Sequence, residues 1–194
     1  MLLLPQDALR QNPESMCPPE IQRELRVLEV LHQGFDRKLH TGQIVVHNLV
    51  TKDVSNFFRL AWKLKFPIRK IIPISQYNWD DVASCEDNNS SGYNFRRIAA
   101  TGKLSKHAIG CAFDINPFMN VYIRYDENGK EIDRLPHNGE YEPFVPGTLT
   151  ADHPLVEFMI ERGWTWGGNW TPDSGRVDYQ HFEIVPPELA HYVQ

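Results

Sequence analysis

Two short stretches of the sequence hold side chains that could bind a metal ion. The first, SKHAIGCAFD at 105–114, contains His107 and Asp114, and the second, DYQH at 178–181, contains Asp178 and His181. A catalytic zinc site takes three nitrogen or oxygen ligands from the protein, keeps an open position for water, and needs a base beside that water. His107, Asp114 and His181 fit the ligand set, and Asp178 fits the base.

The spacing within each stretch requires a change in backbone direction. His107 and Asp114 are seven residues apart, so in one regular strand their side chains would lie on opposite faces. Gly110 is well placed for a bend, because glycine adopts backbone conformations that other residues avoid. Asp178 and His181 are three residues apart, so we expect Asp178 to lie on the loop that leads into the strand holding His181.

Each of these residues has a simpler alternative role. A histidine in an apolar setting is more often a hydrogen-bonded structural residue than a ligand, and Asp178 could cap a turn. Asp114 stands out because it lies in an apolar run, where a buried carboxylate needs a cation or several donors. The tryptophans at 164, 166 and 170 are more often part of a core than a binding platform.

Periodicity and turn residues predict the elements that would position these stretches. Helices are expected over 18–34, 51–66 and 150–162, and strands over 43–49, 68–74, 109–115 and 181–184. A long polar loop is expected over 76–92, and an irregular excursion over 120–147 that could fold as a hairpin above the site. We expect a polar N-terminal arm over 1–17 and a single domain over 18–194.

Composition limits the partners of this chain. With 194 residues, 41% of them hydrophobic, the chain can bury one core of ordinary size. A net charge of -5 with no stripe of Lys and Arg argues against nucleic acid. The apolar start is too short for a signal peptide, no segment is long enough to span a membrane, and no apolar stripe demands a second copy, so we expect a monomer. Three cysteines are too few for a disulfide framework, although one pair could still form a bridge.

Four motifs follow one another along the chain. They are YNFR at 93–96, SxHxxGxAxD at 105–114, GWxWGG at 163–168 and DxxHFE at 178–183. This ordered series, within residues 40–185, resembles the zinc D-alanyl-D-alanine carboxypeptidase family. That group includes the vancomycin-resistance carboxypeptidases and the L-alanyl-D-glutamate endopeptidases of phage lysins.

The resemblance implies a fold and a set of roles. The fold would be α+β, a small antiparallel sheet with helices packed against it, as in the hedgehog/DD-peptidase group. Zinc would be bound by His107, Asp114 and His181. Asp178, where many relatives carry Glu, would be the catalytic acid and base. Arg96 would face a carbonyl or carboxylate oxygen of the substrate, with the adjacent Arg97 as the alternative.

The implied activity is zinc-dependent hydrolysis of peptide bonds in peptidoglycan stem peptides that contain D-amino acids. Both D-Ala-D-Ala carboxypeptidase and L-Ala-D-Glu endopeptidase activity are compatible with the motifs, and the implied location is the periplasm or the cell exterior. The rival hypothesis is a zinc-stabilised binding domain of the same fold without turnover, as in hedgehog signalling domains. Retention of Asp178 beside the ligand set favours the enzyme. The excursion over 120–147 has no counterpart in the family that we can align.

Overall fold

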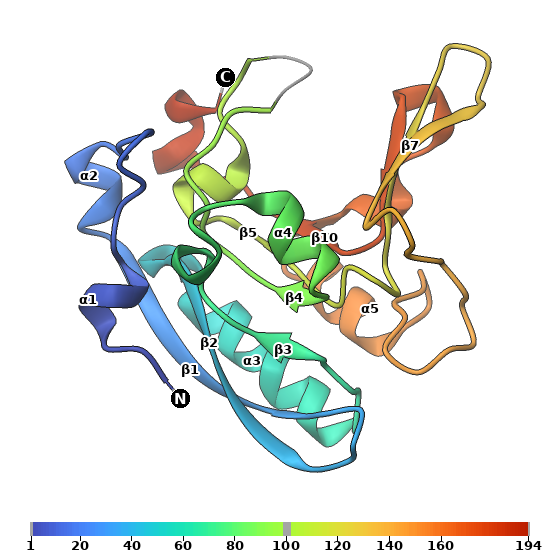
Figure 1. Cartoon of the computed structure of the whole chain (residues 1–194), viewed down its shortest axis with the longest axis horizontal. Helices are drawn as coiled ribbons and strands as arrows, with labels where there is room; N and C mark the ends of the chain where they lie inside the picture. The colour runs from blue at the N-terminus through green and yellow to red at the C-terminus, as the bar shows by residue number, and fades with distance from the viewer. Residues whose placement is uncertain (1, 99–101, 194) are drawn as a thin grey trace.

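The computed structural model describes residues 2–98 and 102–193 of the chain, in a mixed α+β arrangement (Figure 1). The helices are α1 (Pro5–Ala8), α2 (Pro19–Gln22), α3 (Thr51–Lys63), α4 (Asp81–Glu86) and α5 (Pro154–Ile160). Short 3₁₀ helices are η1 (Asn48–Val50), η2 (Ile74–Tyr77), η3 (Lys106–Ile109), η4 (Gly167–Asn169), η5 (Pro172–Ser174) and η6 (Pro187–Tyr192). The strands are β1 (Leu25–Gln33), β2 (Leu39–His47), β3 (Lys70–Ile71), β4 (Asn89–Ser90), β5 (Ala112–Asp114), β6 (Tyr122–Tyr125), β7 (Glu131–Leu135), β8 (Thr165–Trp166), β9 (Arg176–Asp178) and β10 (His181–Glu183).

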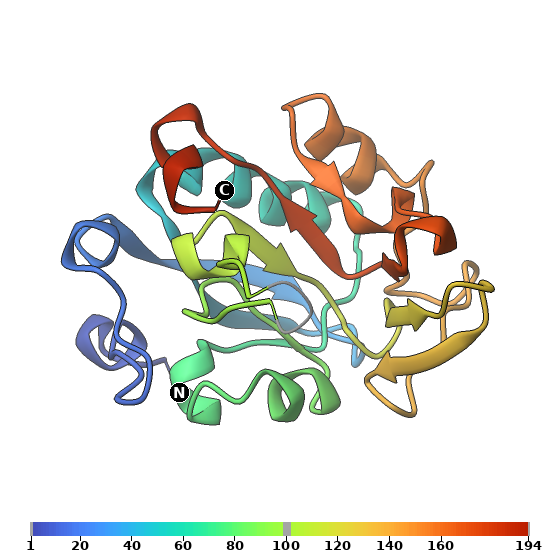
Figure 2. The ribbon, with the colours of Figure 1, turned by 90° about the horizontal axis from the view of Figure 1, so that it is seen from above.

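The strands form four small sheets. Strands β1 and β2 make an antiparallel ribbon, β3 and β4 a short parallel pair, and two antiparallel sheets have the orders β5-β10-β8 and β7-β6-β9. In Figure 2 the β6–β7 hairpin lies at the opposite end of the molecule from α1 and α2. The expected small antiparallel sheet with packed helices is therefore present, divided into several short pieces.

An aromatic cluster joins α3 to the β5-β10-β8 sheet. Phe57 lies on the buried face of α3, where it packs edge-on against Phe113 of β5 and Phe182 of β10 at ring-centroid distances of 5.1 and 5.5 Å. Phe113 and Phe182 stack on each other at 5.2 Å, and Trp164 meets Phe113 edge-on at 5.4 Å. Such pairs add to the free energy of apolar burial. These ring contacts fix the positions of β5 and β10, the two strands that carry Asp114 and His181.

The helix predicted over 18–34 is wrong. Only α2, a single turn, is helical there, and residues Leu25–Gln33 form β1, paired with β2 along its whole length. The helical spacing of the leucines is misleading, because Leu31 is 52% exposed whereas Val30 is buried. Nine residues of backbone pairing outweigh the local propensity. The expected helix end at Gly34 is instead the start of the β1–β2 turn.

Other elements follow the sequence more closely. The predicted helix over 51–66 and the closing strand over 181–184 are confirmed as α3 and β10. The strand expected over 43–49 is part of β2, which begins earlier, at Leu39, and ends at His47, before η1. The strand expected over 68–74 shortens to β3, and the helix expected from 150 begins only at Pro154, where the His153 side chain accepts a hydrogen bond from the Leu155 backbone. The loop expected over 76–92 contains α4 and β4, so it is more ordered than its polar composition indicates.

The N-terminal segment lies against the rest of the chain. The Leu3 backbone exchanges hydrogen bonds of 2.7 and 3.0 Å with the Gln43 side chain, and Ser75 donates to the Asp7 carbonyl. The division of the chain at residue 17 stays a prediction. The three cysteines at 17, 85 and 111 are free thiols, and among the described residues no helix has the length and apolarity needed to cross a membrane.

Candidate metal centre

The turn around Gly110 brings the two halves of the first motif to one point. Ser105 caps η3 by accepting a hydrogen bond from the His107 backbone, which fixes the start of this turn. Gly110 then adopts a left-handed conformation with φ +68°, and β5 begins two residues later and ends at Asp114. The predicted bend at Gly110 is therefore confirmed.

A side chain at position 110 should disrupt this turn. In Gly110→Ala the new Cβ would meet the backbone nitrogen of His47 at 2.6 Å, in addition to the strain of a positive φ. We expect a loss of about 2–5 kcal/mol in the free energy of unfolding, measured by urea denaturation. Gly163→Ala is a matched control, because Gly163 has φ +82° but open space at the Cβ, and it should cost only about 1–2 kcal/mol. Equal losses in the two variants would contradict the close packing at Gly110.

The second motif spans two strands. Asp178 is the last residue of β9, and β10 starts three residues later with His181. The expectation that Asp178 lies on a loop is wrong, because β9 pairs with β6, a partner supplied by the excursion over 120–147. In the β5–β10 pairing His181 lies directly opposite Asp114, which brings their side chains together.

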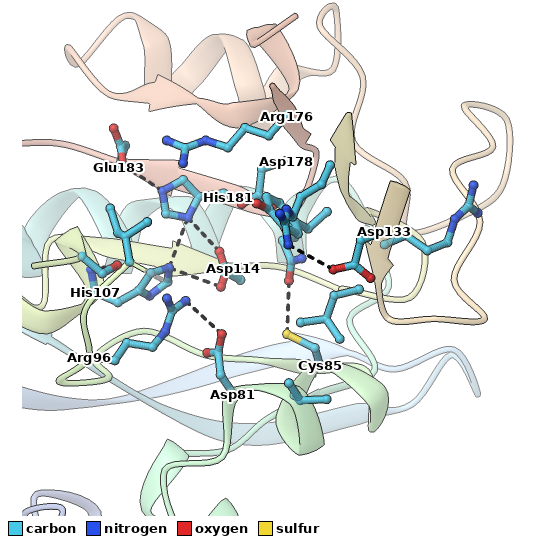
Figure 3. Close-up of a pocket in the computed structure, with 18 of the residues that line it drawn as sticks. Asp81, Cys85, Arg96, His107, Asp114, Asp133, Arg176, Asp178, His181 and Glu183 are labelled. Atoms are coloured by element: carbon cyan, nitrogen blue, oxygen red, sulfur yellow. Dashed lines mark hydrogen bonds and ion pairs between the residues drawn. The ribbon is translucent and has the colours of Figure 1, made fainter. Parts of the chain in front are cut away.

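The three candidate ligands form a buried cluster (Figure 3). The Nε2 atom of His107 lies 3.3 Å from Asp114 Oδ2, the Nδ1 atom of His181 lies 3.0 Å from Asp114 Oδ1, and the two imidazole nitrogens are 3.1 Å apart. Ligand atoms around one tetrahedral zinc ion are separated by roughly 3.3–3.6 Å. Two nitrogens and a carboxylate converging at this spacing fit a zinc ion, which small adjustments of the side chains would admit.

Outer partners orient both imidazoles. His107 Nδ1 donates to the Gly92 carbonyl at 2.6 Å, which leaves Nε2 facing the cluster, and His181 Nε2 lies 3.0 Å from the Glu183 carboxylate, which leaves Nδ1 facing it. Carbonyl or carboxylate acceptors behind ligand histidines are typical of metal sites, because they fix the tautomer and the ring orientation. Glu183 belongs to the DxxHFE motif, but its residue type and spacing alone do not mark it as a functional residue.

The cluster is also strongly polarised. Burial alone would raise the pKa of Asp114, but its pairing with His107 and His181 outweighs burial and lowers this pKa well below the usual range. Burial alone would lower the pKa of His181, whereas its hydrogen bonds to Asp114 and Glu183 raise it to about 10. The metal-free cluster therefore holds a proton that a bound cation would replace.

Asp178 sits beside the cluster, and one of its carboxylate oxygens has no hydrogen-bond partner in the described part of the chain. Its Oδ1 atom is buried and makes no hydrogen bond to any residue that the structure describes. Burial raises the pKa of its carboxyl to about 7, with His181 and Arg96 acting in the opposite direction. An unpaired buried carboxylate oxygen is costly in a folded protein. The orphaned oxygen fits a group that exchanges a proton or a hydrogen bond with a molecule bound in the cleft.

The structure separates the two candidate arginines. Arg96 lines the same pocket as the cluster and forms an ion pair with Asp81 of α4 at 2.9 Å, and its buried Nε has no partner among the described residues. Arg97 is exposed, and its guanidinium donates to the Gly102 carbonyl. Of the two, Arg96 is therefore the one able to reach a bound molecule.

The excursion over 120–147 closes one side of the pocket. As expected, it contains a hairpin, formed by β6 and β7, and side chains of both strands line the pocket, which has a volume of about 570 Å³. Trp170 lines it too, with its ring 5.6 Å from that of His181, whereas Trp164 and Trp166 are buried in the core. The arrangement joins a candidate metal cluster, an unpaired carboxylate and an arginine in one cleft, a set suited to hydrolysis of a polar bond.

Comparison with known protein families agrees with this chemistry. Residues 99–184 match the D-alanyl-D-alanine carboxypeptidase family. The matched region contains the whole of the His107, Asp114 and His181 cluster and also Asp178, whereas Arg96 lies just before it. The match bears out the resemblance in the motifs and indicates a peptidase. No curated protein and no solved structure matches the chain significantly.

Proposed function

We propose that this carboxypeptidase-like protein is a zinc-dependent metallopeptidase that hydrolyses peptide bonds in peptidoglycan stem peptides containing D-amino acids. Its fold would be that of the hedgehog/DD-peptidase group, and its place of action the periplasm or the cell exterior, where that substrate occurs. The observation that carries the proposal is the pairing of the His107, Asp114 and His181 cluster with the unpartnered Oδ1 of Asp178 in one pocket.

In this proposal the zinc ligands are His107 Nε2, a carboxylate oxygen of Asp114 and His181 Nδ1, the atoms that face one another across the cluster. Zinc bound by two imidazoles and a carboxylate acts as a Lewis acid on a carbonyl oxygen and lowers the pKa of water. The Gly92 carbonyl and the Glu183 carboxylate hold the two rings in the required orientation.

Asp178 moves the proton. Its Oδ1 accepts a proton from the attacking water and returns it to the leaving amine, and a carboxyl with a raised pKa is suited to both transfers near neutral pH. Arg96, which Asp81 holds in place, would stabilise negative charge on the substrate carbonyl or bind a substrate carboxylate. The unpartnered Oδ1 favours this catalytic role over a purely structural zinc domain, which has no use for a base.

Loss of the carboxylate behind His181 should weaken zinc binding. Glu183→Ala removes the acceptor of His181 Nε2, so the ring is free to rotate and to change tautomer. We expect zinc affinity to fall about 10–100-fold, measured by competition with a chromophoric chelator. The control is Lys106→Met, which removes the 3.3 Å ion pair to Glu183 but leaves the bond from Glu183 to His181. Unchanged affinity in Glu183→Ala would contradict the orienting role.

The reaction itself can be tested by mass spectrometry. Zinc-loaded protein is incubated with purified muropeptides, and the products are identified by mass. Release of a terminal D-Ala would identify a carboxypeptidase, and cleavage between L-Ala and D-Glu an endopeptidase. Absence of any cleavage by zinc-loaded protein would overturn the proposed function.

A further inference from the structure

In the β7-β6-β9 sheet, charged side chains of neighbouring strands lie side by side and line the pocket. In the β9–β6 pairing Asp178 lies opposite Tyr122, and Arg176 lies opposite Arg124. Residues two apart on a strand share a face, so Arg176 projects on the same side as Asp178, while Val177 between them is buried. Arg176 is therefore fixed by register on the same wall of the pocket as the proposed base.

Arg176 differs from the other cationic side chains of the pocket. Four of these side chains have carboxylate partners within 4 Å: Arg96 with Asp81, Lys106 with Glu183, Arg124 with Asp133, and Arg134 with Glu131. Arg176 forms no ion pair or side-chain hydrogen bond with any residue in the described part of the chain. Its guanidinium lies instead over the Trp170 ring, 4.6 Å from the centroid.

The charge of Arg176 is only partly offset by neighbouring side chains. Like charges directly opposite each other on neighbouring strands repel, and Arg176 faces Arg124 in this way. Asp133 pairs with Arg124 at 3.6 Å, whereas Asp178, on the same face of β9, attracts Arg176 without forming an ion pair within 4 Å. A stacked guanidinium is held in place while its N–H donors stay available, which is an arrangement suited to binding a carboxylate through two parallel hydrogen bonds.

Trp170 connects this guanidinium to the candidate metal cluster. Its ring lies 5.6 Å from that of His181 and 4.6 Å from the Arg176 Cζ. Figure 3 shows the Arg176 side chain extending from its strand toward the His181 side of the pocket. An anion bound there would lie within about three extended residues of the cluster.

We propose that Arg176, supported by Trp170, is a specificity residue that binds a carboxylate of the peptide substrate. The proposal rests on the proposed function, and it adds a second anion-binding side chain to the site on the wall opposite Arg96. The bound carboxylate is either the free C-terminus of the peptide or the carboxylate of an acidic residue close to the scissile bond. Peptides in which that carboxylate is amidated should be poor ligands.

The test measures peptide binding apart from turnover. The full chain carrying Asp178→Asn, with zinc added, is titrated by calorimetry with the peptide L-Ala-D-Glu-L-Lys-D-Ala-D-Ala. Two further peptides separate the sources of the carboxylate: one has a C-terminal amide, and the other has D-Gln in place of D-Glu. The same titrations are made after adding Arg176→Gln, Arg176→Lys or Arg10→Gln. Arg10 is the matched control, because it also lies over a tryptophan, Trp79, but outside the pocket.

We expect Arg176→Gln to weaken binding of the acidic peptide about 10–100-fold, the range for a charge-assisted bidentate contact. One of the two amidated peptides, the C-terminal amide or the D-Gln peptide, lacks the carboxylate that Arg176 binds. Arg176→Gln should leave the binding of that peptide unchanged. Arg176→Lys should restore part of the affinity and Arg10→Gln should change nothing. The proposal would be overturned if Arg176→Gln lowered the affinity for all three peptides equally, or for none of them. It would also be overturned if the Asp178→Asn protein, which retains Arg176, did not bind the acidic peptide. Failure of the proposed function would be seen separately, as absence of hydrolysis by the zinc-loaded wild type.

Discussion

Asp114→Ala should abolish stoichiometric zinc binding. Asp114 contributes a carboxylate that faces both His107 and His181, so its loss removes one of three proposed ligands and the charge that pairs with both imidazoles. Zinc affinity should fall by more than the roughly 10–100-fold that loss of an outer partner causes. Hydrolysis should be lost with it. The measurement is zinc content per chain by elemental analysis after dialysis against a buffer of fixed free zinc.

The control for Asp114→Ala is Asp173→Ala. Asp173 is an exposed carboxylate on η5, outside the pocket, so its removal makes a similar change in net charge without touching the cluster. This variant should keep about one zinc per chain. Circular dichroism is measured on both variants, because a loss of zinc has meaning only in a folded chain. Full zinc occupancy in folded Asp114→Ala would refute Asp114 as a ligand.

Asp178→Asn should remove most of the turnover and leave zinc in place. The substitution preserves the shape of the side chain but removes the carboxylate that would accept the proton, and Asp178 is not part of the three-residue cluster. General acid–base catalysis contributes about 10²–10⁴-fold, so kcat should fall by that factor while zinc content stays near one per chain. A variant with wild-type kcat would exclude Asp178 as the base.

The pH profile gives a second test of Asp178. Burial raises the pKa of its carboxyl to about 7 in the metal-free protein, and the positive charge of a bound zinc ion would lower it. Because the base acts in its ionised form, kcat should fall tenfold per pH unit below that pKa, at a midpoint no higher than about pH 7. The residual activity of Asp178→Asn should not show this fall of kcat at low pH. If kcat of the variant fell with the same midpoint, the titrating group would be a residue other than Asp178.

Residue types predicted which side chains meet in the pocket better than they predicted the elements that hold them. His107, Asp114 and His181 could be proposed as a set because their residue types match the donors zinc prefers, and Gly110 predicted the bend that brings two of them together. The motif series predicted the family match over 99–184. These inferences needed only residue type, order and local backbone freedom.

The parts that sequence reasoning missed depend on pairing between distant segments. β1 was predicted as a helix because its leucines recur at helical spacing, and only the partner strand β2 makes it extended. The three-residue spacing from His181 predicts a loop at Asp178, but β9 is extended there because it pairs with β6, a strand of the excursion over 120–147. Arg176 gave no signal for the same reason, since its place in the pocket depends on the register between β9 and β6. Periodicity within one segment does not specify such a register.

The most direct test of a zinc-dependent peptidase at this cluster is a zinc titration of activity. Metal-free protein, prepared by dialysis against a chelator, is given increasing zinc, and hydrolysis of a stem peptide ending in D-Ala-D-Ala or containing L-Ala-D-Glu is followed by mass spectrometry. We expect no hydrolysis without zinc, a linear rise with added zinc, and saturation at about one zinc per chain. Hydrolysis that does not depend on zinc, or none at any zinc concentration, would contradict the proposed function.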